Sequence, residues 1–130
     1  MSSPPSSREE RDQIIALDKR YVWHPYTAME EWIARGRPLV IARAEGAWLH
    51  DLDGRALLDG NSSWWVASLG HNHPRLVRAL REQSERMCHV ALAGITHEPA
   101  VAAARDLIAV APAGLSRVFF SDDGSTAVEV

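Results

Sequence analysis

Two adjacent tryptophans, Trp64 and Trp65, lie in a stretch of small and turn-forming residues that runs from Asp59 to Pro74. A planar aromatic ring on a loop of glycine, serine and asparagine can line a pocket for an elongated apolar or ring-bearing ligand. The alternative is structural, because one buried and one half-exposed tryptophan can simply hold the loop against a core. These residues alone leave both interpretations open.

A second candidate site follows the apolar segment 117–120, where the chain reads Ser-Asp-Asp-Gly-Ser-Thr. This pattern places Gly124 and Ser125 at the start of an expected helix, where free backbone N–H groups and the helix dipole favour a phosphate. Asp122 and Asp123 count against a phosphate, because a nearby carboxylate repels it unless the carboxylate points away. The alternative is a plain helix cap provided by an aspartate or a serine.

Tyr26 follows His24-Pro25, and a phenol on a rigid proline turn can reach into a site as a hydrogen-bond donor. The simpler alternative is a tyrosine packed in a loop.

Of the six histidines, His71 and His73 have a spacing that could place two ligands on one side of a strand. No carboxylate or cysteine pattern completes a zinc set with them, so we expect no metal site.

Composition narrows the class of protein. The chain has 130 residues, 46% of them hydrophobic, and a net charge of -3, which suits a globular domain and gives no basic block for nucleic acid. A single cysteine, Cys88, excludes an internal disulfide framework and fits a reducing compartment. No apolar run approaches the roughly 18 residues of a membrane span. We therefore expect a soluble, cytoplasmic protein.

The hydrophobic pattern predicts an α/β protein that opens with an antiparallel meander. The expected helices cover residues 8–20, Pro74 to about His89, a segment capped by Thr96 that ends near Ala111, and a last helix that begins near Ser125. The expected strands are Leu39–Ile41, Gly46–His50, Arg55–Leu58 and Arg117–Phe120, with a hairpin turn at Asp53-Gly54. The expected organisation is a lead and helix over 1–20, a segment with the meander and the tryptophan loop over 21–71, and the start of a larger domain over 72–130.

Five motifs, taken in order, resemble one family. They are Trp23-His-Pro-Tyr26-Thr, Asp59-Gly-x-Ser-Ser-Trp64-Trp65, Gly70-His-x-His-Pro74, Gly94-Ile-Thr-His97-x-Pro-Ala and Phe119-Phe-Ser-Asp-x-Gly124-Ser125-x-x-Val-Glu-Val. Together they are similar to the start of the adenosylmethionine–8-amino-7-oxononanoate aminotransferases, a family of class III pyridoxal-phosphate enzymes. The last motif is common to many class III aminotransferases, whereas the Trp-His-Pro-Tyr and Ser-Ser-Trp-Trp strings are the specific ones.

The resemblance implies a fold type I homodimer with active sites at the subunit interface. It implies transfer of the amino group of S-adenosylmethionine to 8-amino-7-oxononanoate, giving 7,8-diaminononanoate in biotin biosynthesis. By the same resemblance, Gly124 and Ser125 bind the phosphate of pyridoxal 5'-phosphate, Trp64 lines the substrate pocket, and Tyr26 lies near the cofactor as a catalytic or substrate-positioning residue. The chain departs from the family at Asn61, where methionine is common, and at Asp123, where serine is usual.

A transaminase also needs a lysine for its covalent chemistry. The sequence holds one lysine, Lys19, in the charged helix near the start, and its surroundings do not resemble those of a cofactor lysine. We therefore expect this chain to be an incomplete piece that is inactive and folds poorly by itself. The alternatives are another class III omega-aminotransferase with a different amine donor, and a non-catalytic fragment that uses the tryptophan loop to bind a ligand or a protein.

Overall fold

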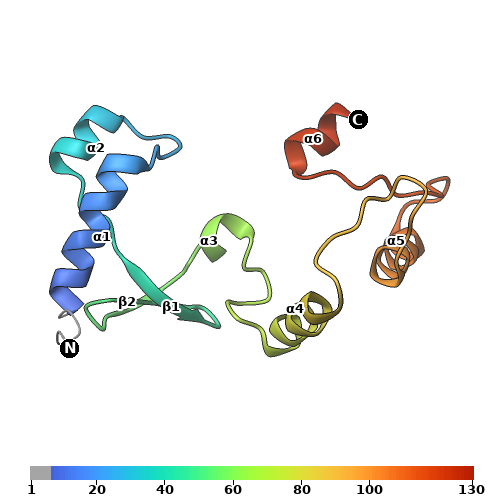
Figure 1. Ribbon diagram of the computed structural model, residues 1–130, viewed down its shortest axis with the longest axis horizontal. Coiled ribbons are helices and arrows are strands. Elements are labelled where there is room, and N and C mark those ends of the chain that lie inside the picture. Colours follow the sequence, from blue (N-terminus) through green and yellow to red (C-terminus); the bar gives the residue numbers. More distant parts are fainter. Residues whose placement is uncertain (1–6) are drawn as a thin grey trace. The chain divides into compact units, whose positions relative to one another are not determined.

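The computed structural model describes residues 7–130, which divide into two compact units, the first ending at Arg81 and the second covering Glu82–Val130 (Figure 1). The first unit contains α1 (Ser7–Tyr21), α2 (Met29–Arg35), β1 (Ile41–Glu45), β2 (Trp48–Asp51), β3 (Ala56–Leu58) and α3 (Ser62–Trp65). The second contains α5 (Glu98–Val110) and α6 (Gly124–Glu129), and α4 (Pro74–Arg86) crosses the boundary. The domain limits expected from the sequence stay a prediction.

Helices α1 and α2 form a hairpin around one carboxylate. Asp18 of α1 lies 2.9 Å from Nε2 of His24 in the connecting loop and accepts a hydrogen bond from Nε1 of Trp32 in α2 at 3.1 Å. The bond with His24 is the main reason that the pKa of Asp18 lies below its usual value. Lys19 donates to the backbone oxygen of Ile33 at 2.9 Å, so this lysine satisfies a carbonyl near the end of α2.

The predicted antiparallel meander is confirmed, although its first strand is Ile41–Glu45 and not Leu39–Ile41. The strands pair in the order β1-β2-β3, antiparallel throughout, with an irregularity in register between Ile41 and Arg43. The β2–β3 turn is organised by Asp51, which accepts from the backbone N–H and the Nε of Arg55 at 2.8 and 2.6 Å. Arg11 of α1 donates to both oxygens of Asp53 at 2.7 and 2.9 Å, so the turn is joined to the first helix.

The second half of the chain corrects several expectations. Helix α4 ends at Arg86 rather than near His89, and His97 rather than Thr96 occupies the N-cap of α5, in extended backbone and without a side-chain cap bond. The predicted strand Arg117–Phe120 is wrong, because no other described segment pairs with it, and a strand exists only through its ladder.

Large apolar side chains remain exposed throughout the described residues. None of the hydrophobic side chains in residues 7–130 is buried, and Trp23, Trp65 and Phe119 are 86%, 77% and 73% exposed. Burial of apolar surface is the main favourable term in folding, so the described residues lack most of the core that would stabilise them. The expectation of poor independent folding stays a prediction, and this exposure gives its physical reason. No helix in the described residues is long and apolar enough to cross a membrane.

Two glycines with the same backbone conformation allow a matched test of the loop after α3. Gly70 and Gly54 both have φ +82, a region that costs an L-residue about 1–2 kcal/mol. A Cβ at Gly70 would meet the Gly46 backbone at 3.2 Å, whereas one at Gly54 would meet nothing within 4 Å. We predict that Gly70→Ala lowers the free energy of unfolding of the intact protein by more than Gly54→Ala, as measured by urea denaturation. Equal losses would show that the close approach of Gly70 to Gly46 does not matter.

Candidate active site

The tryptophan loop leaves the meander and returns to it. At its start, the N–H of Asp59 donates to the carbonyl of Ala47 at 2.9 Å. At its end, Gly46 and His71 exchange two backbone hydrogen bonds of 3.0 and 2.7 Å in an isolated antiparallel bridge. Both ends of the loop are therefore fixed to the same β1–β2 turn.

The centre of this loop is a left-handed turn. Ser62, Ser63, Trp64 and Trp65 have φ values of 53, 47, 65 and 72, although none is a glycine. Each L-residue in this conformation costs about 1–2 kcal/mol because its Cβ crowds the following carbonyl. The sequence predicted a loop of small residues here, but not this conformation, so local interactions must hold the turn.

The carboxylate of Asp59 stabilises this turn through the side chains of Ser63 and His71. We name these three residues the Asp59 clasp. The Ser63 hydroxyl donates to Oδ2 of Asp59 at 2.7 Å, and Nε2 of His71 lies 2.8 Å from the same oxygen. The Ser63 backbone N–H, the Ser63 hydroxyl and His71, in that order, lower the pKa of Asp59 to about 2. The clasp is therefore charged at neutral pH. The N–H of Trp64 donates a further hydrogen bond to the side-chain oxygen of Asn61 at 3.3 Å.

The clasped turn presents Trp64 to Tyr26. The two rings stack with their centroids 5.4 Å apart and their planes inclined by 29°. Such aromatic pairs are worth about 0.5–1.5 kcal/mol beyond the area they bury. Trp64 stays 58% exposed and Tyr26 93% exposed, so the pair keeps free aromatic surface. Two residues chosen from the sequence, 38 positions apart, thus form one exposed aromatic wall, although their roles are not tested by this geometry.

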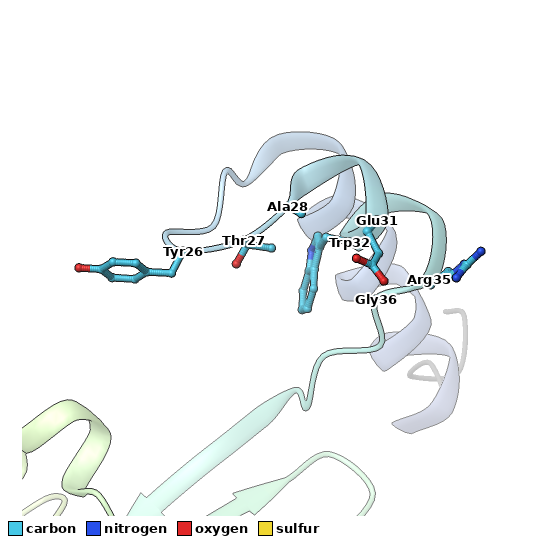
Figure 2. A pocket seen from close by; sticks show the side chains of 7 residues that line it. All are labelled: Tyr26, Thr27, Ala28, Glu31, Trp32, Arg35 and Gly36. Carbon is cyan, nitrogen blue, oxygen red and sulfur yellow. The ribbon is translucent and has the colours of Figure 1, made fainter.

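An open pocket of about 370 Å³ lies beside Tyr26, between the loop before α2 and α2 itself (Figure 2). Its lining is Tyr26, Thr27, Ala28, Glu31, Trp32, Arg35 and Gly36. Figure 2 shows the phenol of Tyr26 extending away from α2, at the opposite end of the pocket from Arg35. The sequence interpretation missed this pocket because it did not predict α2. The signals were present in the acidic first turn and in the Glu31/Arg35 pair at helical spacing.

The Gly124-Ser125 turn belongs to the second unit. Asp123 caps α6, accepting from the N–H of Thr126 at 2.8 Å, while its own N–H donates to the Thr126 hydroxyl at 3.0 Å. The Thr126 N–H is the main reason that the pKa of Asp123 is lowered. This is the capping arrangement considered as the alternative to a phosphate. It also turns the Asp123 carboxylate towards its own helix, and a Cβ at Gly124 would meet nothing within 4 Å.

The set of donors at this turn suits an anion. Asp123 takes the Thr126 N–H, which leaves the Gly124 amide and the Ser125 hydroxyl as donors, and the glycine leaves room for a close approach. Tyr26 and Trp64 come together in the first unit, whereas Gly124 and Ser125 belong to the second. Among residues 7–130, no group of three histidine, cysteine or acidic side chains could hold a metal ion.

Comparisons with known proteins agree on one family. The class-III aminotransferase family model matches residues 32–130. Among curated proteins, the chain is 44% identical over 127 residues to the adenosylmethionine-8-amino-7-oxononanoate aminotransferase of Nitratidesulfovibrio vulgaris, covering 98% of the chain and 23% of that protein. It is 45% identical over 122 residues to the enzyme of the same name from Mycobacterium leprae, covering 92% of the chain and 28% of that protein.

Solved structures give the same answer. A crystal structure of adenosylmethionine-8-amino-7-oxononanoate aminotransferase from Methanocaldococcus jannaschii matches with a TM-score of 0.86 at 37% identity, over 91% of this chain and 27% of that one. An omega transaminase from Pseudomonas jessenii in complex with PMP matches with a TM-score of 0.83 at 32% identity, over 89% of this chain and 26% of that one. The predicted fold class, a fold type I pyridoxal-phosphate transferase, is confirmed.

The match in sequence covers most of the chain, which spans about a quarter of the length of the curated relatives. The family model alone accounts for residues 32–130, well over half of the sequence. The chain therefore belongs to the class-III aminotransferases.

Proposed function

We propose that an aminotransferase containing this sequence moves the amino group of S-adenosylmethionine to the ketone of 8-amino-7-oxononanoate, giving 7,8-diaminononanoate. The observation that carries the proposal is the stack of Tyr26 on Trp64, because it joins the two motifs that are specific to this family in one exposed wall. The names of the curated relatives support the same substrates.

In this proposal, Trp64 supplies the flat surface against which the adenosyl group or the long alkyl chain of a substrate packs. Its indole is more than half exposed, so a ligand can cover it without breaking the stack. Tyr26 supports the indole and, with its phenol extending from the turn, can donate a hydrogen bond to a substrate or cofactor group. The two residues together position the substrate.

The cofactor of the proposed reaction is pyridoxal 5'-phosphate, which accepts the amino group and passes it on. Gly124 and Ser125 hold its phosphate through the Gly124 amide and the Ser125 hydroxyl. The Asp123 carboxylate accepts the Thr126 N–H at the same end of the helix, so the phosphate depends on the donors that Asp123 does not use. Lys19, the one lysine of the sequence, donates a hydrogen bond to the Ile33 carbonyl. We therefore do not assign Lys19 as the lysine that the reaction requires.

Exposed apolar side chains leave room for further contacts. Trp23, Trp65 and Phe119 are mostly exposed in the described residues, and the chain spans about a quarter of the length of its curated relatives. We propose a homodimer in the cytoplasm, where the free thiol of Cys88 would stay reduced.

A second candidate is another class III omega-aminotransferase with a different amine donor. The similarity to the omega transaminase of Pseudomonas jessenii supports it at the level of the fold. The Trp64–Tyr26 wall favours the S-adenosylmethionine enzyme, because an adenosyl group presents a flat ring to stack on it. A non-catalytic binding fragment is favoured by no further observation.

The phosphate site can be tested through cofactor retention. In the full-length enzyme, we predict that Ser125→Ala raises the dissociation constant of pyridoxal 5'-phosphate roughly tenfold, because one hydrogen bond to a charged group is lost. The constant is measured by titrating the apo-enzyme and following cofactor absorbance. Ser121→Ala, in the same turn but bonded only to the Asp123 carbonyl at 3.4 Å, is the control and should leave the constant unchanged. An unchanged constant in Ser125→Ala would refute the assignment.

The aromatic wall can be tested through substrate kinetics. We predict that Trp64→Ala raises the KM for S-adenosylmethionine by about tenfold, as loss of a large aromatic contact implies. Trp48→Ala removes a similarly half-exposed tryptophan from β2 and should lower Tm with little change in KM. If Trp64→Ala changes only Tm, Trp64 serves packing and not substrate binding.

A further inference from the structure

We propose that Asp59 is a positioning residue for the substrate. Through Ser63 and His71, its carboxylate holds the left-handed turn in the one conformation that stacks Trp64 on Tyr26, and it thereby sets the affinity for the substrate. The inference rests on the proposed function, because it takes Trp64 as part of the substrate pocket.

The left-handed turn needs a restraint. Residues with a β-carbon favour right-handed backbone, and Ser63 and Trp64 lie at φ 47, ψ 54 and φ 65, ψ 45. A relaxation of this turn to right-handed geometry would redirect the Trp64 side chain. Trp64 is 58% exposed, so packing against a core cannot prevent such a change.

The Asp59 clasp connects this turn with the sheet. Ser63 lies inside the turn, whereas His71 lies beyond it and is fixed by its two backbone bonds with Gly46. One oxygen of Asp59 is shared by both side chains. The N–H of Asp59 donates to the carbonyl of Ala47 and fixes Asp59 in place. The clasp therefore fixes the position of Trp64 relative to the β1–β2 turn.

Two side chains of the clasp are well protected from solvent. The Asp59 side chain is 7% exposed and that of His71 is 17% exposed, in a loop whose tryptophans are largely open to solvent. Hydrogen bonds to an ionised carboxylate are stronger than those between neutral groups, and both partners approach closer than 2.9 Å. Asp59 reaches the substrate only through Trp64, so it is not a catalytic residue.

A double-mutant cycle in the full-length enzyme loaded with pyridoxal 5'-phosphate tests the proposal. We expect Asp59→Asn to raise the KM for S-adenosylmethionine about fivefold with a smaller change in kcat, since weakening one charged interaction has an effect of this order. In a Trp64→Ala background, the same substitution should leave KM unchanged, because residues that act through one another are not additive. An equal increase in KM in both backgrounds would overturn the proposal.

Two controls separate positioning from stability. Asp51→Asn weakens another protected aspartate, bonded to Arg55 in the same unit, and should lower Tm without raising KM. An increase in KM as large as that of Asp59→Asn would assign the effect to general destabilisation and overturn the proposal.

If Asp59→Asn does not fold, Ser63→Ala serves in its place. It removes the hydroxyl that donates to Asp59, and it should raise KM in the same direction by a smaller factor. An unchanged KM in Ser63→Ala would then count against the clasp.

A spectroscopic readout keeps this proposal distinct from the proposed function. Without any substrate, the near-UV circular dichroism of the Tyr26–Trp64 stack should be lost in Tyr26→Leu and in Asp59→Asn, and kept in Asp51→Asn. Retention of the signal in Asp59→Asn would overturn the positioning role. A wild-type enzyme that has the signal but does not use S-adenosylmethionine would overturn the proposed function alone.

Discussion

A left-handed turn built from residues other than glycine is the constraint on which the candidate site depends. Ser62, Ser63, Trp64 and Trp65 all have positive φ, and each would be more stable in right-handed backbone. Two sets of interactions oppose the preference for right-handed backbone. Backbone hydrogen bonds fix both ends of the loop to the β1–β2 turn, and Asp59 bonds to Ser63 and His71. Local strain is concentrated at the residue that the proposed function places against the substrate, as is common for functional loops.

Carboxylates, rather than a hydrophobic core, join the elements of the first unit. Asp18 connects α1 with the loop before α2 and with α2, Asp51 closes the β2–β3 turn, and Asp59 connects the tryptophan loop with the sheet. Each accepts more than one donor, and each has a lowered pKa. The charges are therefore present at neutral pH and contribute to structure there. The apolar side chains of the same elements stay exposed and available for further contacts.

The sequence allowed the meander and the long helices to be predicted, because each depends on local pattern. A cap by an aspartate or a serine at the start of α6 was considered only as the alternative to a phosphate site. The sequence also allowed Tyr26 and Trp64 to be chosen, but not their contact, since the loop geometry that joins them depends on the clasp. Helix α2 was missed because it is only seven residues long, and short helices carry little periodicity. The strand at 117–120 was predicted from composition, yet a strand also needs a neighbour, which no described segment provides. The phosphate role of Gly124 and Ser125 stays a prediction.

The most direct test of the account is a half-reaction with a single amine donor. The full-length enzyme, loaded with pyridoxal 5'-phosphate, is mixed with S-adenosylmethionine in the absence of any ketone, and conversion of the cofactor to its amine form is followed by absorbance. The account predicts conversion of the bound cofactor, followed by its recovery when 8-amino-7-oxononanoate is added. Conversion by other amines but none by S-adenosylmethionine would contradict it and assign the wall of Tyr26 and Trp64 to a different substrate.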